Sequence, residues 1–241
     1  MLRAHHAATA ASPLRRWLAT AAAARPTALV AVADGSEEIE TACITDVLVR
    51  AGVDVTLATV KPADHADGMT VTCSRGLKLV ADATTDALYD SGAVFDALVL
   101  PGGMPGADAL FESKSLRAMI FRQHMQGGSV SAAHGGKAGV LGAICAAPAR
   151  VLARQGVLKA AEATCYPEAE LRELLAQGAA AVDEAAAVVV FEERIVTSQG
   201  PATALQFGVE LVRLLVGEEK AEEVADGLLL PRSGRRRVSV K

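Results

Sequence analysis

The strongest constraint on the fold is the alternation of short apolar runs with helix-like patterns between residues 27 and 230. Short apolar, β-prone runs are typical of buried strands, whereas apolar residues spaced three and four apart are typical of one helix face. Such alternation indicates an α/β fold, a mostly parallel sheet with helices on both faces. The pattern predicts strands at 27–33, 53–60, 71–73, 77–82, 95–100, 140–145 and 163–166, a hairpin at 187–198, and helices at 38–50, 107–126, 167–177, 205–216 and 218–229.

The order of these elements also predicts where a site would lie. In such sheets, ligands bind at the carboxyl ends of the strands, near the point where the strand order reverses. Asp34–Glu40, Pro101–Gly103 and Cys145 each stand at the end of a predicted strand. We therefore expect these three segments to meet at one edge of the sheet.

The composition limits the classes of partner. The formal net charge is -4 at pH 7, which argues against a phosphate-binding surface over the whole fold and therefore against a nucleic-acid partner. No apolar run approaches the roughly 18 residues that a membrane-spanning helix needs, so no membrane partner is expected. The 4 cysteines are scattered without a CxxC pair, which suits a reducing compartment and forms neither a disulfide framework nor a zinc site. We expect no metal and no cofactor.

Three segments differ from the rest in composition. Residues 1–26 are rich in Arg and Ala and contain no acidic residue, which is typical of an organellar transit peptide. Mitochondrial targeting is expected, with a plastid or the cytoplasm as alternatives. Residues 126–139, rich in Gly, Ser and Ala, are expected to form a flexible insertion, and basic residues 231–241 a disordered tail. The folded domain is therefore predicted to span residues 27–230.

Cys145 is the first candidate catalytic residue. It ends the predicted strand at 140–145, and a turn with Pro148 leads into a helix-like pattern. A strand–turn–helix junction presents a side chain at the top of the sheet on a strained turn. The thiol would face unpaired backbone N–H groups and the positive end of a helix, both of which favour the thiolate. The turn alone leaves open whether Cys145 is a nucleophile or a buried structural cysteine.

Three acidic residues, Glu37, Glu38 and Glu40, follow the first predicted strand. Acidic residues favour the first turn of a helix, which Ser36 can cap, so two of them need no other role. Glu40 is expected to lie on the strand-end side, together with Ile39 and the core. A partly buried carboxyl beside a thiol tends to stay protonated, because two close anions repel each other. Glu40 would then donate a hydrogen bond to the thiolate and carry a proton during the reaction.

The third candidate is PGG at 101–103. Glycine lets a backbone N–H approach a ligand closely, and the amides of Gly103 and Ala146 are candidates for an oxyanion hole. The motif is also common in ordinary loops, and it lacks the Lys and Ser/Thr of a phosphate-binding loop.

Taken together, these segments resemble the ThiJ/PfpI superfamily, and within it the Parkinsonism-associated protein deglycase branch, with the nearest likeness to bacterial ThiJ-like members. The resemblance covers about residues 27–230 and implies a flavodoxin-like three-layer sandwich that usually forms a homodimer. The matching motifs are GSEEIE at 35–40, RAGVDVT at 50–56, LPGGMPGA at 100–107, AICAAP at 143–148, TCYP at 164–167, TSQGPATA at 197–204 and VGEEKAEEVA at 216–225.

The resemblance also implies roles for individual residues. Cys145 would be the nucleophile, and Glu40 the carboxylic acid that touches it. The backbone amides that bind the oxyanion or the substrate would come from Gly102, Gly103 and Ala146. The other residues expected around the pocket are Tyr166, Glu37 and Pro201.

Three positions depart from the family pattern. Tyr166 stands where many relatives have a histidine, and tyrosine cannot act as a base near neutral pH, so Glu40 would carry the proton alone. Ala146 stands where protease-like relatives have a histidine, which argues against a peptidase. Gln199 replaces an arginine of some relatives. The histidines that match no catalytic position of the family are His5, His6, His65, His124 and His134.

Two classes of function follow from the resemblance. One is a glyoxalase III-type enzyme that converts methylglyoxal to lactate without glutathione, or a deglycase that acts on glycated protein side chains. The other is an oxidative-stress sensor or redox-regulated chaperone that works through oxidation of Cys145. Both use the same geometry, so the sequence leaves them open, together with a pseudo-enzyme that retains the pocket.

Overall fold

The computed structural model describes residues 25–62, 64–66, 68–125, 139–192, 194–231 and 238–240. The strands of the main sheet are β1 (Thr27–Val32), β2 (Asp54–Thr59), β5 (Ala83–Thr84), β6 (Ala97–Leu100), β7 (Val140–Ile144), β10 (Val188–Phe191), β11 (Ile195–Ser198) and β12 (Val238–Val240). Two small sheets pair β3 (Thr70–Thr72) with β4 (Lys78–Val80), and β8 (Glu162–Ala163) with β9 (Ala181–Val182).

Within the described residues, the main sheet has eight strands in the order β12-β10-β11-β7-β6-β1-β2-β5. Every neighbouring pair is parallel except β10 and β11, which form the predicted antiparallel hairpin. The run β2-β1-β6-β7-β11 is the flavodoxin-like order, and the strand order reverses between β1 and β6. The predicted flavodoxin-like α/β sandwich is confirmed.

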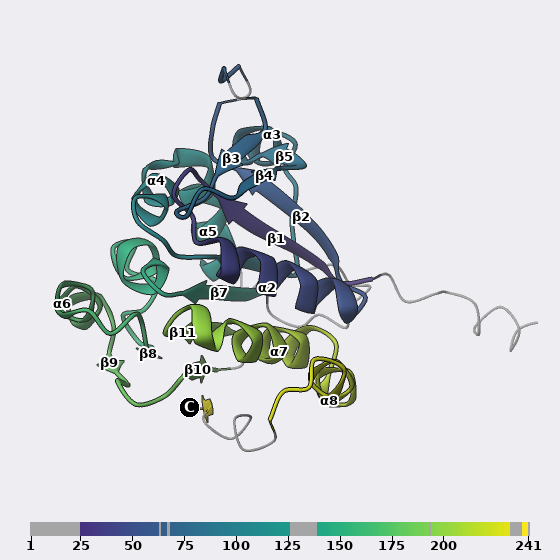
Figure 1. Ribbon diagram of the computed structural model, residues 1–241. Coiled ribbons are helices and arrows are strands. Elements are labelled where there is room, and N and C mark those ends of the chain that lie inside the picture. The colour runs from purple at the N-terminus through teal and green to yellow at the C-terminus, as the bar shows by residue number, and fades with distance from the viewer. Residues whose placement is uncertain are drawn as a thin grey trace, which may run out of the picture.

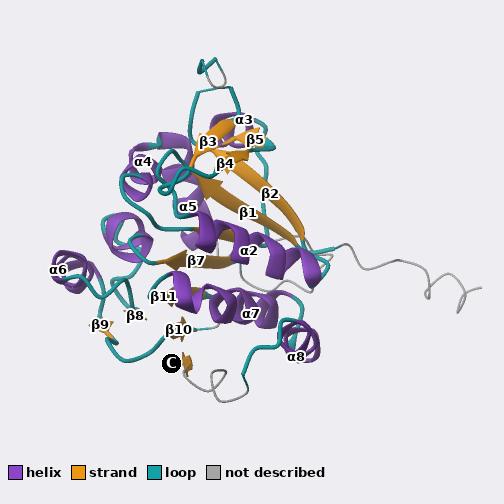
Figure 2. Ribbon diagram, viewed as in Figure 1, coloured by secondary structure: helices purple, strands orange, loops and turns teal. Residues whose placement is uncertain are grey.

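Helices cover both faces of the sheet (Figures 1 and 2). The helices on one face are α2 (Glu38–Arg50), α7 (Ala204–Leu215) and α8 (Glu218–Gly227). The helical segments on the other face are α3 (Thr85–Asp90), α4 (Gly106–Glu112), α5 (Lys114–Met125), the π-helical η2 (Pro148–Ala153) and α6 (Ala169–Gly178). A short 3-10 segment, η3 (Pro201–Thr203), leads into α7.

Strand β1 shows how the sequence produces three layers. Successive side chains of a strand point to opposite faces. Leu29 and Ala31 therefore pack in the core beneath α4, α5 and η2, whereas Val30 and Val32 pack in the core beneath α2 and α7. All four side chains are fully buried. Because both faces of β1 are buried, its sequence is an unbroken apolar run, and this run is the pattern that predicted the strand.

The structure corrects the helix expected at 107–126, which is two helices, α4 and α5. Ser113 separates them with an extended backbone, and its Oγ accepts the N–H of Leu116 at 3.2 Å, as a capping residue does. A further helix, α3, was not predicted; it begins after Thr84, whose Oγ1 accepts the N–H of Ala87 at 3.1 Å. Of the strand expected at 163–166, only Ala163 lies in a strand.

Three residues of the tail that was expected to be disordered, Val238–Val240, form β12 parallel to β10. The described residues do not include 1–24 of the leader expected at 1–26, 126–138 of the insertion expected at 126–139, or 232–237 and 241 of the tail. Within the described part of the chain, no helix is both long and apolar enough to span a bilayer.

Candidate active site

Cys145 sits on a strained turn between β7 and η2. Its φ is 64°, a left-handed conformation that residues other than glycine rarely adopt. Two hydrogen bonds hold this conformation: its N–H donates to the carbonyl of Ser198 at 2.9 Å, and its carbonyl accepts the N–H of Tyr166 at 2.9 Å. The structure therefore has the strained strand–turn–helix junction that the sequence indicated. The role of Ser198 was not anticipated, although its strand lies beside β7.

The Cys145 thiol faces two backbone N–H groups, those of Gly103 and Ala146. The cysteine is only 9% exposed. A Cβ atom at Gly103, which has a φ of 88°, would lie 2.4 Å from the carbonyl oxygen of Gly35. A Cβ atom at Gly102 would lie 2.6 Å from the Cβ of Cys145. Only glycine at these two positions lets the loop after β6 approach the sulfur so closely.

Glu40 lies beside Cys145 and is fully buried. Its Oε2 accepts the N–H of Gly102 at 2.8 Å, and its carboxyl forms a hydrogen bond with the Cys145 side chain. Among the described residues, no N–H or O–H group reaches Oε1. The segments after β1, β6 and β7 therefore meet at one edge of the sheet, as the strand order predicted.

Helix geometry explains why the side chain next to Glu40 in the sequence points away from the core. Ile39 was expected to face the core with Glu40, but it is 53% exposed. Successive side chains of an α-helix differ by about 100° around the axis. Turning Glu40 fully toward the sheet turns Ile39 toward solvent, and the core face of α2 is formed by Ile44, Val47 and Leu48.

Burial controls the protonation of the pair. It raises the pKa of Glu40 to about 7, although the Gly102 N–H lowers it. Burial also raises the pKa of the Cys145 thiol, and an ionised Glu40 raises it further, whereas the amides of Gly103 and Ala146 lower it. The two groups titrate as one coupled pair, which holds one negative charge once its first proton has left. Burial, the largest influence on both groups, favours this charge on Glu40, whereas the two amides that face the sulfur favour the form with the charge on sulfur and the proton on Glu40, which is the reactive form.

Glu37 caps α2, a role that was expected of Ser36. The Oε2 of Glu37 accepts the N–H of Glu40 at 2.8 Å, whereas the Oγ of Ser36 accepts the N–H of Ala33 at 3.0 Å. Glu37 is buried, and its charge contributes to the raised pKa of Glu40. Glu37 therefore holds the start of α2 in place and adds a negative charge near Glu40.

Glu38 ties the β3–β4 turn to the start of α2. Its two carboxylate oxygens accept the Oγ–H of Ser74 at 2.8 Å and the N–H of Arg75 at 2.7 Å. These hydrogen bonds lower the pKa of Glu38, although burial, the largest single influence, raises it. The neighbouring carboxyls Glu38 and Glu40 therefore have pKa values shifted in opposite directions.

Tyr166 and Pro201 were expected around the pocket, and the structure adds Gly200. A Cβ atom at Gly200 would lie 3.1 Å from Cδ2 of Tyr166 and 3.9 Å from Oε1 of Glu40. Gly200 therefore lies next to both side chains, and Pro201 begins η3 directly after it. Gly200 lies in the TSQGPATA motif, but no pattern in the motif indicates that this glycine borders the carboxyl.

The remaining polar candidates are Gln199 and the histidines. The Nε2 of Gln199 donates to the carbonyl of Glu184 at 3.0 Å. His124 lies at the end of α5, ahead of β7, whereas Cys145 follows the opposite end of that strand. His65 lies in the loop between β2 and β3. The remaining histidines, His5, His6 and His134, lie outside the described residues.

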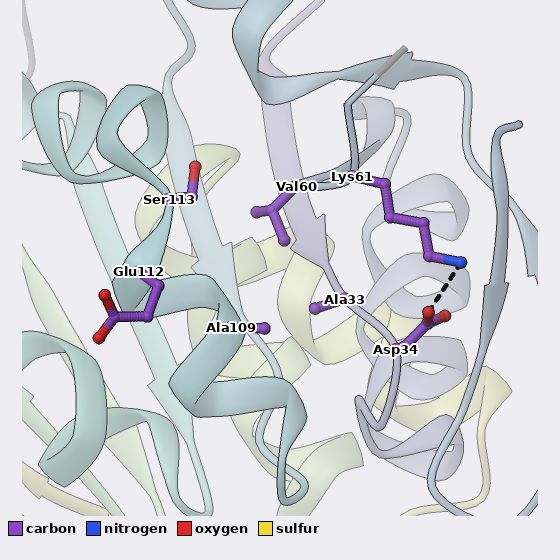
Figure 3. Close-up of a pocket in the computed structure, with 7 residues that line it drawn as sticks. All are labelled: Ala33, Asp34, Val60, Lys61, Ala109, Glu112 and Ser113. Atoms are coloured by element: carbon purple, nitrogen blue, oxygen red, sulfur yellow. Dashed lines mark ion pairs between the residues drawn. The ribbon is translucent and has the colours of Figure 1, made fainter. Parts of the chain in front are cut away.

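A cavity of about 370 Å³ lies between the ends of β1 and β2 and helix α4 (Figure 3). Its lining residues are Ala33, Asp34, Val60, Lys61, Ala109, Glu112 and Ser113. The Nζ of Lys61 forms an ion pair with Asp34 at 2.8 Å. Neither Cys145 nor Glu40 lines this cavity, so it is separate from the thiol site. Nowhere in the described residues do three or more His, Cys, Asp or Glu side chains form a group that could hold a metal ion.

Comparisons with known proteins agree with the fold and the motifs. The model of the DJ-1/PfpI family matches residues 26–214. Protein DJ-1 homolog A of Arabidopsis thaliana is 39% identical over 85% of this chain, which spans about half of that relative, 46% of its length. Glutathione-independent glyoxalase DJR-1.2 of Caenorhabditis elegans is 32% identical over 86% of this chain and 98% of its own length.

A solved structure of Toxoplasma gondii DJ-1 in its oxidised form has a TM-score of 0.71 and 36% identity to this chain. The match covers 85% of this chain and 98% of that protein. The family model covers most of the sequence, and a relative matched over nearly its full length is more than 30% identical. The chain therefore belongs to the DJ-1/PfpI family.

Proposed function

We propose that this protein converts methylglyoxal and related dicarbonyls to hydroxy acids without glutathione, and that the same site can act on glycated protein side chains as a deglycase. The observation that carries the proposal is the buried pair of Cys145 and Glu40, which meets the amides of Gly103 and Ala146. A nucleophile, a proton carrier and two oxyanion donors are the groups that this chemistry needs. One relative carries the name glutathione-independent glyoxalase.

The first step is attack of the Cys145 thiolate on the aldehyde carbon of methylglyoxal. A bond forms between sulfur and carbon, and the electrons of the C=O double bond move to oxygen. The amides of Gly103 and Ala146 bind this oxyanion. Protonated Glu40 then gives its proton to the oxygen, and the product is a neutral thiohemiacetal.

Glu40 next acts as a base. Its carboxylate removes the hydrogen of the former aldehyde carbon as a proton and returns a proton to the neighbouring carbon, while the hydroxyl proton passes to the second oxygen. The first carbon is thereby oxidised to a thioester and the second is reduced to an alcohol. Water cleaves the thioester to lactate and frees Cys145. The overall reaction is therefore methylglyoxal plus water giving lactate, and no external oxidant or reductant takes part.

The proposal is tested by measuring lactate formation from methylglyoxal with the purified chain in the absence of glutathione. Cys145→Ala is expected to abolish turnover, whereas Cys73→Ala, at another buried cysteine, is a matched control that should retain it. Equal rates for wild type and Cys145→Ala would refute the proposal. Free dicarbonyl loss and repair of glycated peptide are measured separately, because loss of the free dicarbonyl alone can mimic deglycation.

A redox sensor is the second candidate, and the oxidised Toxoplasma gondii DJ-1 is the observation that favours it. A reactive thiolate is oxidised by peroxide through sulfenic to sulfinic acid, and protonated Glu40 is placed to donate a hydrogen bond to the sulfinate. Intact mass after peroxide treatment tests this. Stoichiometric sulfinate at Cys145 without any dicarbonyl turnover would favour the sensor over the enzyme.

We also propose that the chain forms a homodimer and that residues 1–26 direct it to mitochondria. The dimer is supported by membership of the DJ-1/PfpI family, and the apolar side chains of Ile39 and Val49 on α2 are exposed in the single chain. Sedimentation of the purified chain tests the dimer, and a monomer at all concentrations would refute it. A fusion of residues 1–26 to a fluorescent protein tests the targeting.

A further inference from the structure

The Tyr166 ring and Gly200 form a wall beside the Glu40 carboxyl. Glu40 is fully buried and Cys145 is 9% exposed, whereas Tyr166 is 43% exposed. A Cβ atom at Gly200 would lie 3.1 Å from Cδ2 and 3.6 Å from Cε2 of Tyr166, and 3.9 Å from Oε1 of Glu40, so the ring and the carboxyl both lie next to this glycine. Tyr166 is therefore the exposed residue next to the buried carboxyl.

Backbone hydrogen bonds fix both parts of this wall. The N–H of Tyr166 donates to the carbonyl of Cys145 at 2.9 Å, which ties the aromatic residue to the nucleophile itself. The Oγ1 of Thr203 accepts the N–H of Gly200 at 3.1 Å and donates to its carbonyl at 2.9 Å. The backbone of both parts of the wall is therefore held in place, and that of Tyr166 is tied directly to Cys145.

The proposed chemistry places one part of the substrate against this wall. Cys145 binds the aldehyde carbon, and Glu40 must reach the neighbouring carbon to return a proton to it. The substituent on that second carbon therefore lies on the Glu40 side, next to Gly200 and Tyr166. In glyoxal this substituent is a hydrogen atom, in methylglyoxal a methyl group, and in phenylglyoxal an aromatic ring.

We infer that Tyr166 and Gly200 determine specificity, so that the site accepts 2-oxoaldehydes with a hydrogen or methyl substituent and rejects those with a bulky one. The inference rests on the proposed glyoxalase function and adds the substrate class to it. Packing differences of a single methylene already change kcat/KM by about tenfold or more in a shaped pocket. Tyr166 acts here through the bulk of its ring, without a role for its hydroxyl.

The test compares kcat/KM for glyoxal, methylglyoxal and phenylglyoxal in four proteins. Tyr166→Ala opens the wall and is expected to raise the phenylglyoxal to methylglyoxal ratio at least about tenfold. Tyr166→Phe keeps the ring and should keep the wild-type ratio. Tyr89→Ala, at the other tyrosine of the chain and with similar exposure of 44%, is the matched control and should change nothing.

Gly200→Ala tests the wall in the opposite direction. Gly200 has a φ of 164°, an extended backbone that alanine can adopt, so the new methyl group acts through its tight contact with the Tyr166 ring, because its distance of 3.9 Å to Oε1 of Glu40 is ordinary van der Waals contact. It should lower kcat/KM for methylglyoxal more than for glyoxal. The double variant Gly200→Ala/Tyr166→Ala should restore the methylglyoxal to glyoxal ratio, a rescue that general destabilisation of the fold would not produce.

Alkylation of Cys145 gives a second readout that needs no turnover. Tyr166→Ala should speed modification by N-phenylmaleimide relative to iodoacetamide, as followed by intact mass. If the wild-type protein turns over no dicarbonyl but Tyr166→Ala raises the ratio of the N-phenylmaleimide rate to the iodoacetamide rate, the glyoxalase proposal fails. The inference that Tyr166 and Gly200 limit the size of the group that reaches Cys145 then stands. If wild type is active but neither the turnover ratios nor the alkylation ratio changes in Tyr166→Ala and Gly200→Ala, the inference is overturned and the glyoxalase proposal stands.

Discussion

Replacing Glu40 by glutamine should make the protein more stable above neutral pH while it removes activity. The amide keeps the shape of the carboxyl, and its oxygen can still accept the Gly102 N–H that Oε2 accepts at 2.8 Å. It carries no charge at any pH and holds no transferable proton. The expected loss in kcat/KM for methylglyoxal is about 10²–10⁴-fold, the usual contribution of a general acid–base group.

The size of the stability gain follows from the pKa of Glu40. Burial raises this pKa from 4.5 to about 7. Below about pH 4.5 the carboxyl is protonated in both the folded and the unfolded chain, so burial of its charge costs nothing. As pH rises through this window the unfolded chain ionises first, and the folded protein loses stability until about pH 7. At about 1.4 kcal/mol per pKa unit, the full cost is about 3 kcal/mol.

Urea unfolding of wild type and Glu40→Gln between about pH 4.5 and 8 measures this effect. The free energy of unfolding of Glu40→Gln minus that of wild type should rise by about 3 kcal/mol across the window. Glu38→Gln is the matched control, because hydrogen bonds lower the pKa of Glu38 and the glutamine variant should be less stable than wild type at neutral pH. A pH-independent difference between wild type and Glu40→Gln would refute a raised Glu40 pKa.

Two other substitutions test the packing on which the site depends. Gly102→Ala would place a Cβ atom 2.6 Å from that of Cys145, so it should lower turnover by about tenfold or more and also lower the melting temperature. The control is Gly227→Ala, whose Cβ atom would meet nothing within 4 Å and which should be neutral. Equal effects of the two substitutions would contradict the close approach of the Gly102 loop to Cys145. Arg213→Ala leaves the buried Glu210 carboxylate without its cation and should lower the free energy of unfolding, measured with urea, by about 3 kcal/mol. A loss below about 1 kcal/mol would show that the Arg213–Glu210 ion pair is not buried as described.

The sequence was sufficient for the parts of the fold that periodicity encodes. Buried parallel strands appear as unbroken apolar runs, so β1, β6 and β7 could be located within one or two residues. Polar capping residues were harder to interpret. Ser113 stands between two helical patterns and interrupts them through its side chain, a contact that apolar spacing does not reveal.

The candidate site was predictable where strand ends determine it. Cys145, Glu40 and Gly103 meet because parallel strands bring their carboxyl ends together. The capping role of Glu37 and the contact between Gly200 and Glu40 depend on side-chain directions and loop paths, which the sequence pattern does not specify. The side-chain direction of Ile39 was likewise not predictable from the pattern, because the turn of the helix that buries Glu40 places its apolar neighbour Ile39 in solvent.

The shared proton of Cys145 and Glu40 is tested most directly by the rate of Cys145 alkylation with iodoacetamide between about pH 5 and 10. Peptide mapping separates this thiol from Cys43, Cys73 and Cys165. In wild type the rate should reach half its plateau near pH 7, where the pair loses its first proton, and Glu40→Gln should move this midpoint upward. A midpoint above about pH 9 in both proteins would mean an ordinary buried thiol and would contradict the proposed nucleophile.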